Sequence, residues 1–245
     1  MTKVSGAAWS SAPGHLFLTA GEIHIWRAYL QDLESLPLYQ SLLSADELAR
    51  AERYHFADDK RKYILARGIL RTLLGRYLNI EPAALHFEYG KQGKPAIVFN
   101  QNKINLQFNI SHSADMACYA FTLNEAIGID VEYHNEELAY LEIAKRFFSA
   151  KEMEQLIQQP EMQQNSFFYS LWTCKEAYIK ALGQGLFLAL DQFSIQFLPC
   201  NKILIESAYQ TGRWELKLVN TSAEYTIAVA MAGGNNRFQY YEYSH

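Results

Sequence analysis

Ser44-Ala45-Asp46-Glu47 and Ser149-Ala150-Lys151-Glu152 each open a helical stretch, one in either half of the chain. Both have the S-x-x-E form of a capping box, in which the serine and the glutamate satisfy free backbone amides at a helix start. Arg67 follows Ser44 by 23 residues and Lys175 follows Ser149 by 26, and each is followed eight positions later by the glycine of a Leu-Gly pair. This faint repeat predicts an α/β (α+β) fold built from two similar halves.

The expected elements support a division into residues 1–124 and 125–245. In the first half the sequence predicts a strand, a long helix and short strands at 22–29, 45–78, 96–99, 105–109 and 116–122. In the second half it predicts a strand, two helices and β-rich segments at 127–133, 150–158, 166–182, 193–198, 203–206, 214–219, 225–231 and 238–243.

Composition limits the classes of function. The 245 residues carry a formal net charge of −4, which argues against nucleic acid as a partner, because a basic excess supplies most of that affinity. Cys118, Cys174 and Cys200 lack C-x-x-C spacing and are expected to be buried free thiols. No apolar stretch has the length of a signal sequence or a membrane span, so we expect a cytoplasmic protein without a membrane partner.

Two carboxylates share one face of the expected strand Ile127 to Tyr133. Alternation places Ile129 and Val131 on one face and Asp130 and Glu132 on the other. Paired carboxylates repel each other unless a cation lies between them, and such hard oxygen ligands suit Mg²⁺ with phosphate. A solvated strand face is the alternative.

The expected helix Ser166 to Leu182 has an apolar stripe for packing on a core. Glu176 and Lys180 lie on its opposite face, four residues apart. They form either a simple surface ion pair or a site in which Glu176 binds metal and Lys180 binds phosphate.

Further polar groups suit phosphate binding. Phe108-Asn109-Ile110-Ser111-His112-Ser113 ends a strand in side chains that can hydrogen-bond phosphate oxygens, although a polar turn is the bland alternative. Gly93-Lys94-Pro95 lacks the glycine and Ser/Thr positions of a P-loop and is expected to form a tight turn that presents Lys94. The basic residues between 45 and 78 are expected to be mostly surface charges, one or two of which meet an anionic ligand.

In this order the motifs resemble those of the Sfp-type 4′-phosphopantetheinyl transferase family. The resemblance covers most of the chain and rests on Gly93-Lys94-Pro95, Phe108 to Ser113, Gly128-Ile129-Asp130-Val131-Glu132, Phe147-Phe148-Ser149 and Leu171-Trp172-Thr173-Cys174-Lys175-Glu176-Ala177-Tyr178-Ile179-Lys180. It implies a pseudo-twofold duplication with coenzyme A in the cleft between the halves.

The resemblance also implies roles for individual residues. Asp130, Glu132 and Glu176 match the metal ligands, and Lys180 matches the pyrophosphate contact. The other coenzyme A contacts would come from Arg50, Lys94, Pro95, Asn109, Ser111 and His112. Arg50 matches a contact to the 3′-phosphate, whereas Glu47 occupies a position that is sometimes basic in the family, so Arg53 or Arg67 could contribute instead.

The implied reaction moves phosphopantetheine from coenzyme A to a serine of an apo acyl or peptidyl carrier protein and releases 3′,5′-ADP. Mg²⁺ would offset the pyrophosphate charge, and Glu176, directly or through a metal-bound water, is the hypothetical general base. Two alternatives stay open: a non-catalytic module that binds coenzyme A or a carrier protein, and a metal-dependent phosphohydrolase.

Overall fold

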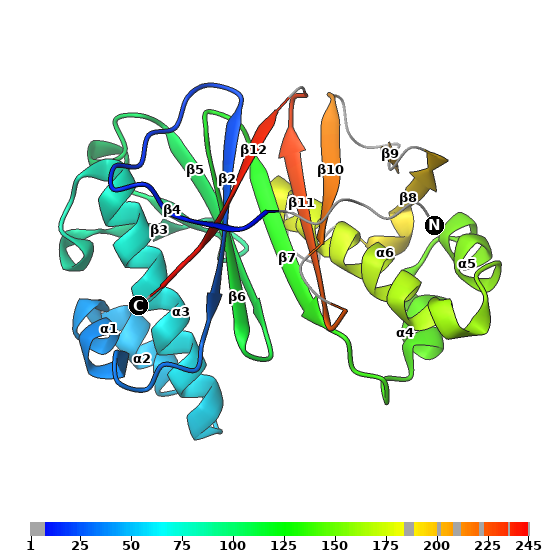
Figure 1. Cartoon of the computed structure of the whole chain (residues 1–245), viewed down its shortest axis with the longest axis horizontal. Helices are drawn as coiled ribbons and strands as arrows, with labels where there is room; N and C mark the ends of the chain where they lie inside the picture. Colours follow the sequence, from blue (N-terminus) through cyan, green and yellow to red (C-terminus); the bar gives the residue numbers. More distant parts are fainter. Residues whose placement is uncertain are drawn as a thin grey trace.

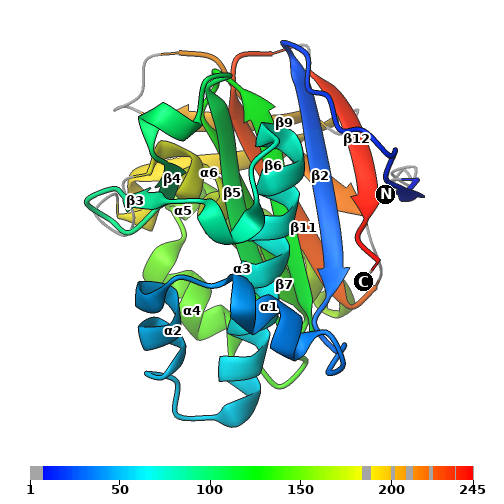
Figure 2. The ribbon, with the colours of Figure 1, turned by 90° about the vertical axis from the view of Figure 1, so that its left-hand side faces the viewer.

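The computed structural model describes residues 8–183, 189–199, 202–207, 212–220, 223–234 and 236–244. Figure 1 shows four layers: helices, a sheet, a second sheet, and helices again. The same layers are seen from one side in Figure 2, where α3 crosses in front of its sheet. The predicted α/β (α+β) class is confirmed.

The element order repeats along the chain. The first half contains β2 (Glu22–Tyr29), α1 (Leu36–Leu42), α2 (Ala45–Ala51), α3 (Ala57–Leu78), η1 (Pro82–Ala84), β3 (Phe87–Tyr89), β4 (Pro95–Ile97), η2 (Phe99–Gln101), β5 (Leu106–Ser113) and β6 (Met116–Leu123). The second contains β7 (Ile127–Tyr133), α4 (Tyr140–Phe147), α5 (Ala150–Ile157), α6 (Glu161–Leu182), η4 (Leu190–Gln192), β8 (Phe193–Leu198), β9 (Lys202–Ser207), β10 (Trp214–Asn220) and β11 (Tyr225–Ala232). Each half is thus a strand, helices, a two-stranded hairpin and two further strands.

The sheets repeat as well. Two further strands, β1 (Ser10–Ser11) and β12 (Arg237–Glu242), lie outside this repeat. Among the described residues one large sheet has the order β1-β12-β2-β6-β5, the other large sheet has the order β10-β11-β7, and β3-β4 and β8-β9 are separate hairpins. In both large sheets, the first strand of the half pairs antiparallel with the last, β2 with β6 and β7 with β11. β12 pairs in parallel with β2, and β1 pairs in parallel with β12. The last strand of the chain therefore lies in the sheet of the first half, which the division at 124/125 does not anticipate.

Apolar residues fill the space between the two sheets. Ile23 and Ile25 of β2 meet Ile129 and Val131 of β7 in one buried cluster, which confirms the predicted apolar face of β7. Each sheet also packs on its own helices through a further apolar cluster, one in each half. Consequently the other face of β7, with Asp130 and Glu132, is turned toward α6.

Some expected elements are wrong in detail. The long helix predicted at 45–78 is two helices, because α2 ends at Ala51 and Phe56 caps a separate α3 with an extended backbone. The helix α6 begins at Glu161, five residues before its predicted start. The short helices α1 and α4 were not predicted, because seven or eight residues are fewer than the roughly 11 over which helical periodicity is read. Both capping boxes are confirmed.

Two smaller expectations concern thiols and membrane helices. Cys118 and Cys174 are buried free thiols, as predicted, and Cys200 lies outside the described residues. Within the described part of the chain, no helix is both long and apolar enough to cross a membrane.

Candidate functional site

Side chains of β5, the edge strand of the sheet of the first half, bind the backbone of β7, the edge strand of the sheet of the second half. We call this junction of β5 and β7 the seam. Alternation along this edge strand places Asn109, Ser111 and Ser113 on one face, toward β7. Asn109 Oδ1 accepts the Ile129 amide proton at 2.9 Å, and Ser113 Oγ accepts that of Tyr133 at 3.1 Å. These side chains take the place of a neighbouring strand at the free edge of β7. The motif predicted to bind phosphate therefore also holds in place β7, the strand that carries Asp130 and Glu132.

Asp130 is the centre of a buried polar group on this seam. Its Oδ1 accepts a hydrogen bond from Ser111 Oγ at 2.9 Å and forms an ion pair with Lys180 Nζ at 2.6 Å. Lys180 Nζ also donates to Ser111 Oγ at 2.8 Å. Asp130 Oδ2 is buried and has no hydrogen-bond partner among the described residues. A buried, unsatisfied carboxylate oxygen is costly, so Asp130 Oδ2 is a candidate ligand for a cation.

Glu132 is held two residues further along β7. Its carboxylate accepts hydrogen bonds from Ser113 Oγ and Trp172 Nε1, both at 3.1 Å. Burial, followed by the negative charge of Asp130, raises the pKa of Glu132 to about 7. Sequence reasoning gave no role to Ser113 or Trp172, although the alternation of Asn109, Ser111 and Ser113 was a signal for the first.

Glu176 completes the predicted acidic set from α6. Burial, and then the charge of Asp130, raise the pKa of its carboxyl group. It has no hydrogen-bond or ion-pair partner within the described part of the chain, and the alternative of a surface pair with Lys180 is wrong because Lys180 pairs with Asp130. Glu176 is therefore a partly buried carboxylate that is free to take a proton or a cation.

The three carboxylates fit Mg²⁺ in their chemistry. Asp130 offers an unsatisfied oxygen, and the pKa values of Glu132 and Glu176 are raised first by burial and then by the charge of Asp130, and a cation would offset both effects. Among the described residues, no three His, Cys, Asp or Glu side chains are gathered closely enough to enclose an ion. The donors are thus of the right kind, and Glu176 comes from α6, which packs on the carboxylate face of β7.

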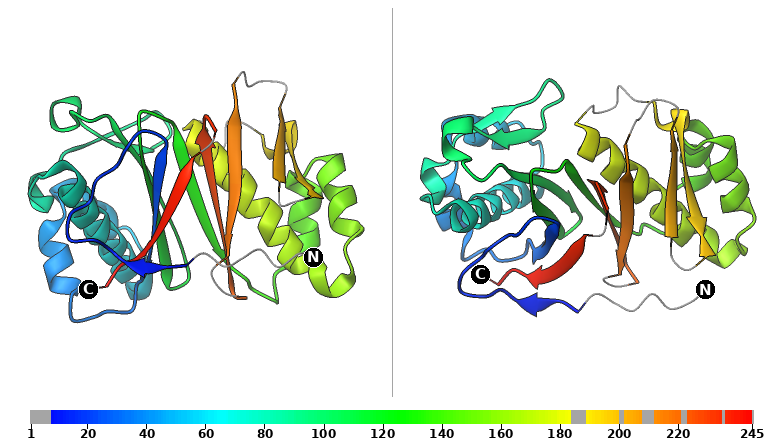
Figure 3. Two further views of the ribbon diagram at one scale, coloured as in Figure 1. Left: turned by 45° about the horizontal axis from the view of Figure 1, so that its top comes forward. Right: turned by 90° about the horizontal axis from the view of Figure 1, so that it is seen from above.

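A cavity of about 280 Å³ lies beside these groups. Its walls come from both halves: the β3–β4 turn, β5 and the C-terminal part of α6. They include the predicted contacts Lys94, Pro95, Asn109, Glu176 and Lys180. Figure 3 shows the hairpin beside the end of α6. The predicted turn is confirmed, with Gly93 at a φ of +79° and its amide donating to Gly90 O at 2.8 Å.

His112 and Arg50 lie outside that cavity. The His112 side chain is exposed, on the face of β5 opposite Ser111. The surrounding protein, and then the Lys180 ammonium, lower the pKa of His112, which favours a neutral imidazole near pH 7. Arg50 lines a separate hollow of about 290 Å³ with Arg53 and Tyr54.

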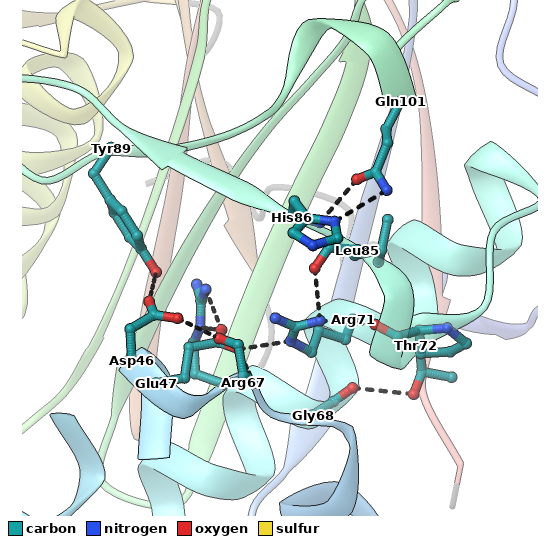
Figure 4. Close-up of polar contacts among 12 residues, drawn as sticks. Asp46, Glu47, Arg67, Gly68, Arg71, Thr72, Leu85, His86, Tyr89 and Gln101 are labelled. Carbon is teal, nitrogen blue, oxygen red and sulfur yellow. Dashed lines mark hydrogen bonds and ion pairs between the residues drawn. The ribbon is translucent and has the colours of Figure 1, made fainter. Parts of the chain in front are cut away.

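Arg67 is buried in an ion pair with Glu47. Glu47 Oε1 accepts a hydrogen bond from Arg67 Nε at 2.7 Å, and Glu47 Oε2 accepts one from Arg71 Nε at 2.7 Å (Figure 4). All three side chains are buried. The expectation that basic residues of this region are mostly surface charges is wrong for both arginines. Of the two suggested substitutes for the 3′-phosphate contact, Arg67 is paired with Glu47, whereas Arg53 lies beside Arg50.

Comparison with known proteins agrees with the motifs. Residues 126–230 match the family model of the 4′-phosphopantetheinyl transferase superfamily, and residues 25–124 match the model described as 4′-phosphopantetheinyl transferase, N-terminal. The chain is 38% identical to 4′-phosphopantetheinyl transferase HetI of Nostoc sp. over 92% of this chain and 94% of that protein. It is 31% identical to 4′-phosphopantetheinyl transferase Sfp of Bacillus subtilis over 79% and 84%.

Among solved structures, the chain resembles a holo-(acyl-carrier-protein) synthase from Bacillus anthracis in complex with CoA (3′,5′-ADP), with a TM-score of 0.40 and 20% identity. That match covers 44% of this chain and 94% of the other. With both halves matched by family models and with HetI matched over nearly its whole length, the chain belongs to the 4′-phosphopantetheinyl transferase family.

Proposed function

We propose that this protein transfers the 4′-phosphopantetheine arm of coenzyme A to a serine of an apo acyl or peptidyl carrier protein. One observation supports this above the others: Lys180 joins Asp130 to Ser111 across the seam, beside a cavity that both halves line. The Lys180 ammonium can offset the charge of a diphosphate directly, and the carboxylates can do so only through a divalent cation that they and the diphosphate would share. A cytoplasmic location stays a prediction from the sequence.

The residues would divide the binding of coenzyme A between them. Lys180 would turn from Asp130 to the pyrophosphate, with Ser111 donating its hydroxyl proton to a phosphate oxygen. We assign His112 to a phosphate through its ring N–H, and Arg50 to the 3′-phosphate. Lys94, Pro95 and Asn109 would form the wall beside the nucleotide. The substrate would then lie in the cleft between the two halves, residues 1–124 and 125–245.

The reaction needs a proton acceptor and a charge acceptor. The carrier serine Oγ would attack the β-phosphorus, the bond from this phosphorus to the bridging oxygen would break, and 3′,5′-ADP would leave. Glu176 would take the serine proton with a carboxylate oxygen that does not bind Mg²⁺, since neither oxygen has a partner among the described residues. Lys180 would stabilise the charge on the departing phosphate.

Asp130, Glu132 and Glu176 would together hold Mg²⁺. When bound, this ion would offset the negative charge that the pyrophosphate carries during transfer.

The direct test is the intact mass of an apo carrier protein after incubation with this protein, coenzyme A and Mg²⁺. We expect a gain of about 340 Da, the mass of the phosphopantetheine unit, which EDTA abolishes. No gain with acyl and peptidyl carriers, despite coenzyme A binding, would favour the non-catalytic module. Release of phosphopantetheine into water, without a gain on the carrier, would favour the phosphohydrolase.

The role of Glu176 has its own test. Glu176→Gln should lower the single-turnover rate by about 100-fold or more while coenzyme A binding, followed calorimetrically, is retained. Glu161→Gln, at the exposed start of the same helix, is the matched control and should keep the rate. Unchanged turnover in Glu176→Gln would refute the assignment.

A further inference from the structure

Lys94 reaches from one half of the molecule into the other. It follows the Gly93 turn of the β3–β4 hairpin, in the first half. Its ammonium group donates to Ile127 O at 2.8 Å, to Lys180 O at 2.8 Å and to Ala181 O at 3.3 Å. All three acceptors belong to the second half.

These acceptors are the start of β7 and the last turn of α6. The final carbonyl groups of a helix have no partner within the helix, and a cation at this end also interacts favourably with the helix dipole. Gly183 ends α6 in a left-handed conformation, with a φ of +64°, and the Lys94 side chain lies close to it. Lys94, a residue of the first half, therefore caps the C-terminus of α6 in the second half.

Lys94 is also connected to Asp130 through a single residue, Lys180. The Lys180 backbone carbonyl accepts from Lys94, and the Lys180 side chain forms the ion pair with Asp130 at 2.6 Å. Ile127, the other acceptor, lies three residues before Asp130 on β7. Lys94 thus ties together the two chain segments that carry the cation and the carboxylate.

The Lys94 ammonium has no donor left for a nucleotide. An ammonium group has three N–H donors, and three carbonyl oxygens surround this one. Burial lowers the pKa of Lys94 to about 8, which agrees with an enclosed position. A phosphate contact would require it to abandon these carbonyl groups.

We propose that Lys94 is a positioning residue for the transfer reaction, which holds the end of α6 on β7 so that Lys180 meets the substrate phosphates. Only the methylene stem of Lys94 then borders the nucleotide. This inference rests on the proposed function and revises the part that a lysine at this position plays in it.

The first experiment removes the ammonium group. Lys94→Met should lower the single-turnover rate by about 10- to 100-fold, since a displacement of about 1 Å at a reacting group has effects of this size. The dissociation constants of coenzyme A and 3′,5′-ADP should change less than about threefold, because no phosphate contact is lost. Lys91→Met, on the same turn and exposed, should match the parent protein in both measurements.

A second variant guards against misfolding of the first. In Lys94→Arg the charge is kept, but a planar guanidinium cannot direct three donors to three convergent carbonyl groups. We expect a reduced rate with unchanged 3′,5′-ADP binding. If Lys94 bound phosphate directly, Arg would preserve the rate, and Lys94→Met would weaken 3′,5′-ADP binding more than about tenfold; either result would overturn the proposal.

A double-mutant cycle tests whether the effect passes through Lys180. If it does, Lys94→Met should cost little in a Lys180→Met background, measured under single-turnover conditions. Additive losses would show that Lys94 acts elsewhere. Failure of the proposed function itself would look different, because the parent protein would then give no carrier mass gain.

Discussion

Both halves of the molecule bury a glutamate at the start of a short helix, but they neutralise it differently. Glu47 and Glu152 each belong to a capping box, and each is essentially inaccessible to solvent, at 1% and 0% exposure. In the second half one amine answers the acid: Lys175 Nζ lies 2.6 and 2.7 Å from the two oxygens of Glu152. In the first half two guanidinium groups answer it, from Arg67 and Arg71.

Lys175 and Arg71 differ in chemical type, but they bind corresponding backbone carbonyl groups. Lys175 also donates to Phe193 O at 2.8 Å, where β8 begins. Arg71 also donates to Leu85 O at 3.1 Å, just before β3 (Figure 4). Each cation therefore joins its helix pair to the following hairpin, and both lie seven residues before the end of a helix of 22 residues.

Arg71 is the counterpart of Lys175 in position and in hydrogen bonding. Counting from the capping serines matched Lys175 with Arg67, one helical turn too early. The glycines of the repeat differ too, since Gly75 lies inside α3 whereas Gly183 ends α6. Both halves thus keep a buried positive charge that links the short helix, the long helix and the segment where the hairpin begins. The residue that supplies this charge differs, Arg71 in one half and Lys175 in the other.

Removing the acid of the first half should have the largest effect. Glu47→Gln keeps the side-chain shape but leaves two buried guanidinium groups, which cannot release a proton. We expect a loss of about 4–5 kcal/mol in the free energy of unfolding, measured by urea denaturation. A loss below about 1 kcal/mol would mean that the arginines find other partners.

The corresponding change in the second half should cost less and depend on pH. Glu152→Gln leaves Lys175, whose pKa is already lowered by burial and would fall further without its partner. The expected loss is about 3 kcal/mol at pH 7. Above the lowered folded pKa the unfolded state binds more protons, so the variant should regain stability between pH 7 and 9. Glu47→Gln, compared at the same two pH values, should show no such recovery.

The sequence was sufficient for the elements with a strong pattern. The alternation in 127–133 predicted both the strand β7 and the common direction of Asp130 and Glu132. It could not predict that Lys180 pairs with Asp130, because the two lie 50 residues apart and meet only when α6 packs on β7. Nor could it predict the burial of Arg67 and Arg71, since a basic residue on a helix is usually solvated.

The halves also differ in the distance between helix and sheet. Large side chains, Trp26, Tyr119 and Phe121, fill the cluster between α3 and its sheet. In the second half, Ala228 and Ala230 of β11 and Gly128 of β7 allow α6 to approach the sheet closely. This close approach brings Lys180 to Asp130, which helps to explain why the acidic set lies in the second half.

Gly128→Ala should break this close approach. The added Cβ would lie 2.1 Å from Ala177 O and 2.3 Å from the Ala181 backbone nitrogen, so α6 must move. We expect a loss of about 2 kcal/mol in stability together with most of the transferase rate. Gly68→Ala is the matched control: its Cβ would clash with Tyr39, in the first half, and should reduce stability while the folded protein keeps its rate. Retained activity in Gly128→Ala would argue against a need for close packing.

The smallest effect separates the two arginines of the first half. Arg71→Met should destabilise the protein by about 1 kcal/mol more than Arg67→Met, because it leaves carbonyl acceptors at Pro82 and Leu85 without their donor. Among the described residues, Arg67 donates to Glu47 but to neither of these carbonyl groups, and both arginines lie over the Phe87 ring, 4.6 and 5.1 Å from its centroid. Urea denaturation of both variants measures the difference. If Arg67→Met proved the more damaging, the match with Lys175 would return to Arg67, and the duplication would have preserved the sequence spacing rather than the place in the helix.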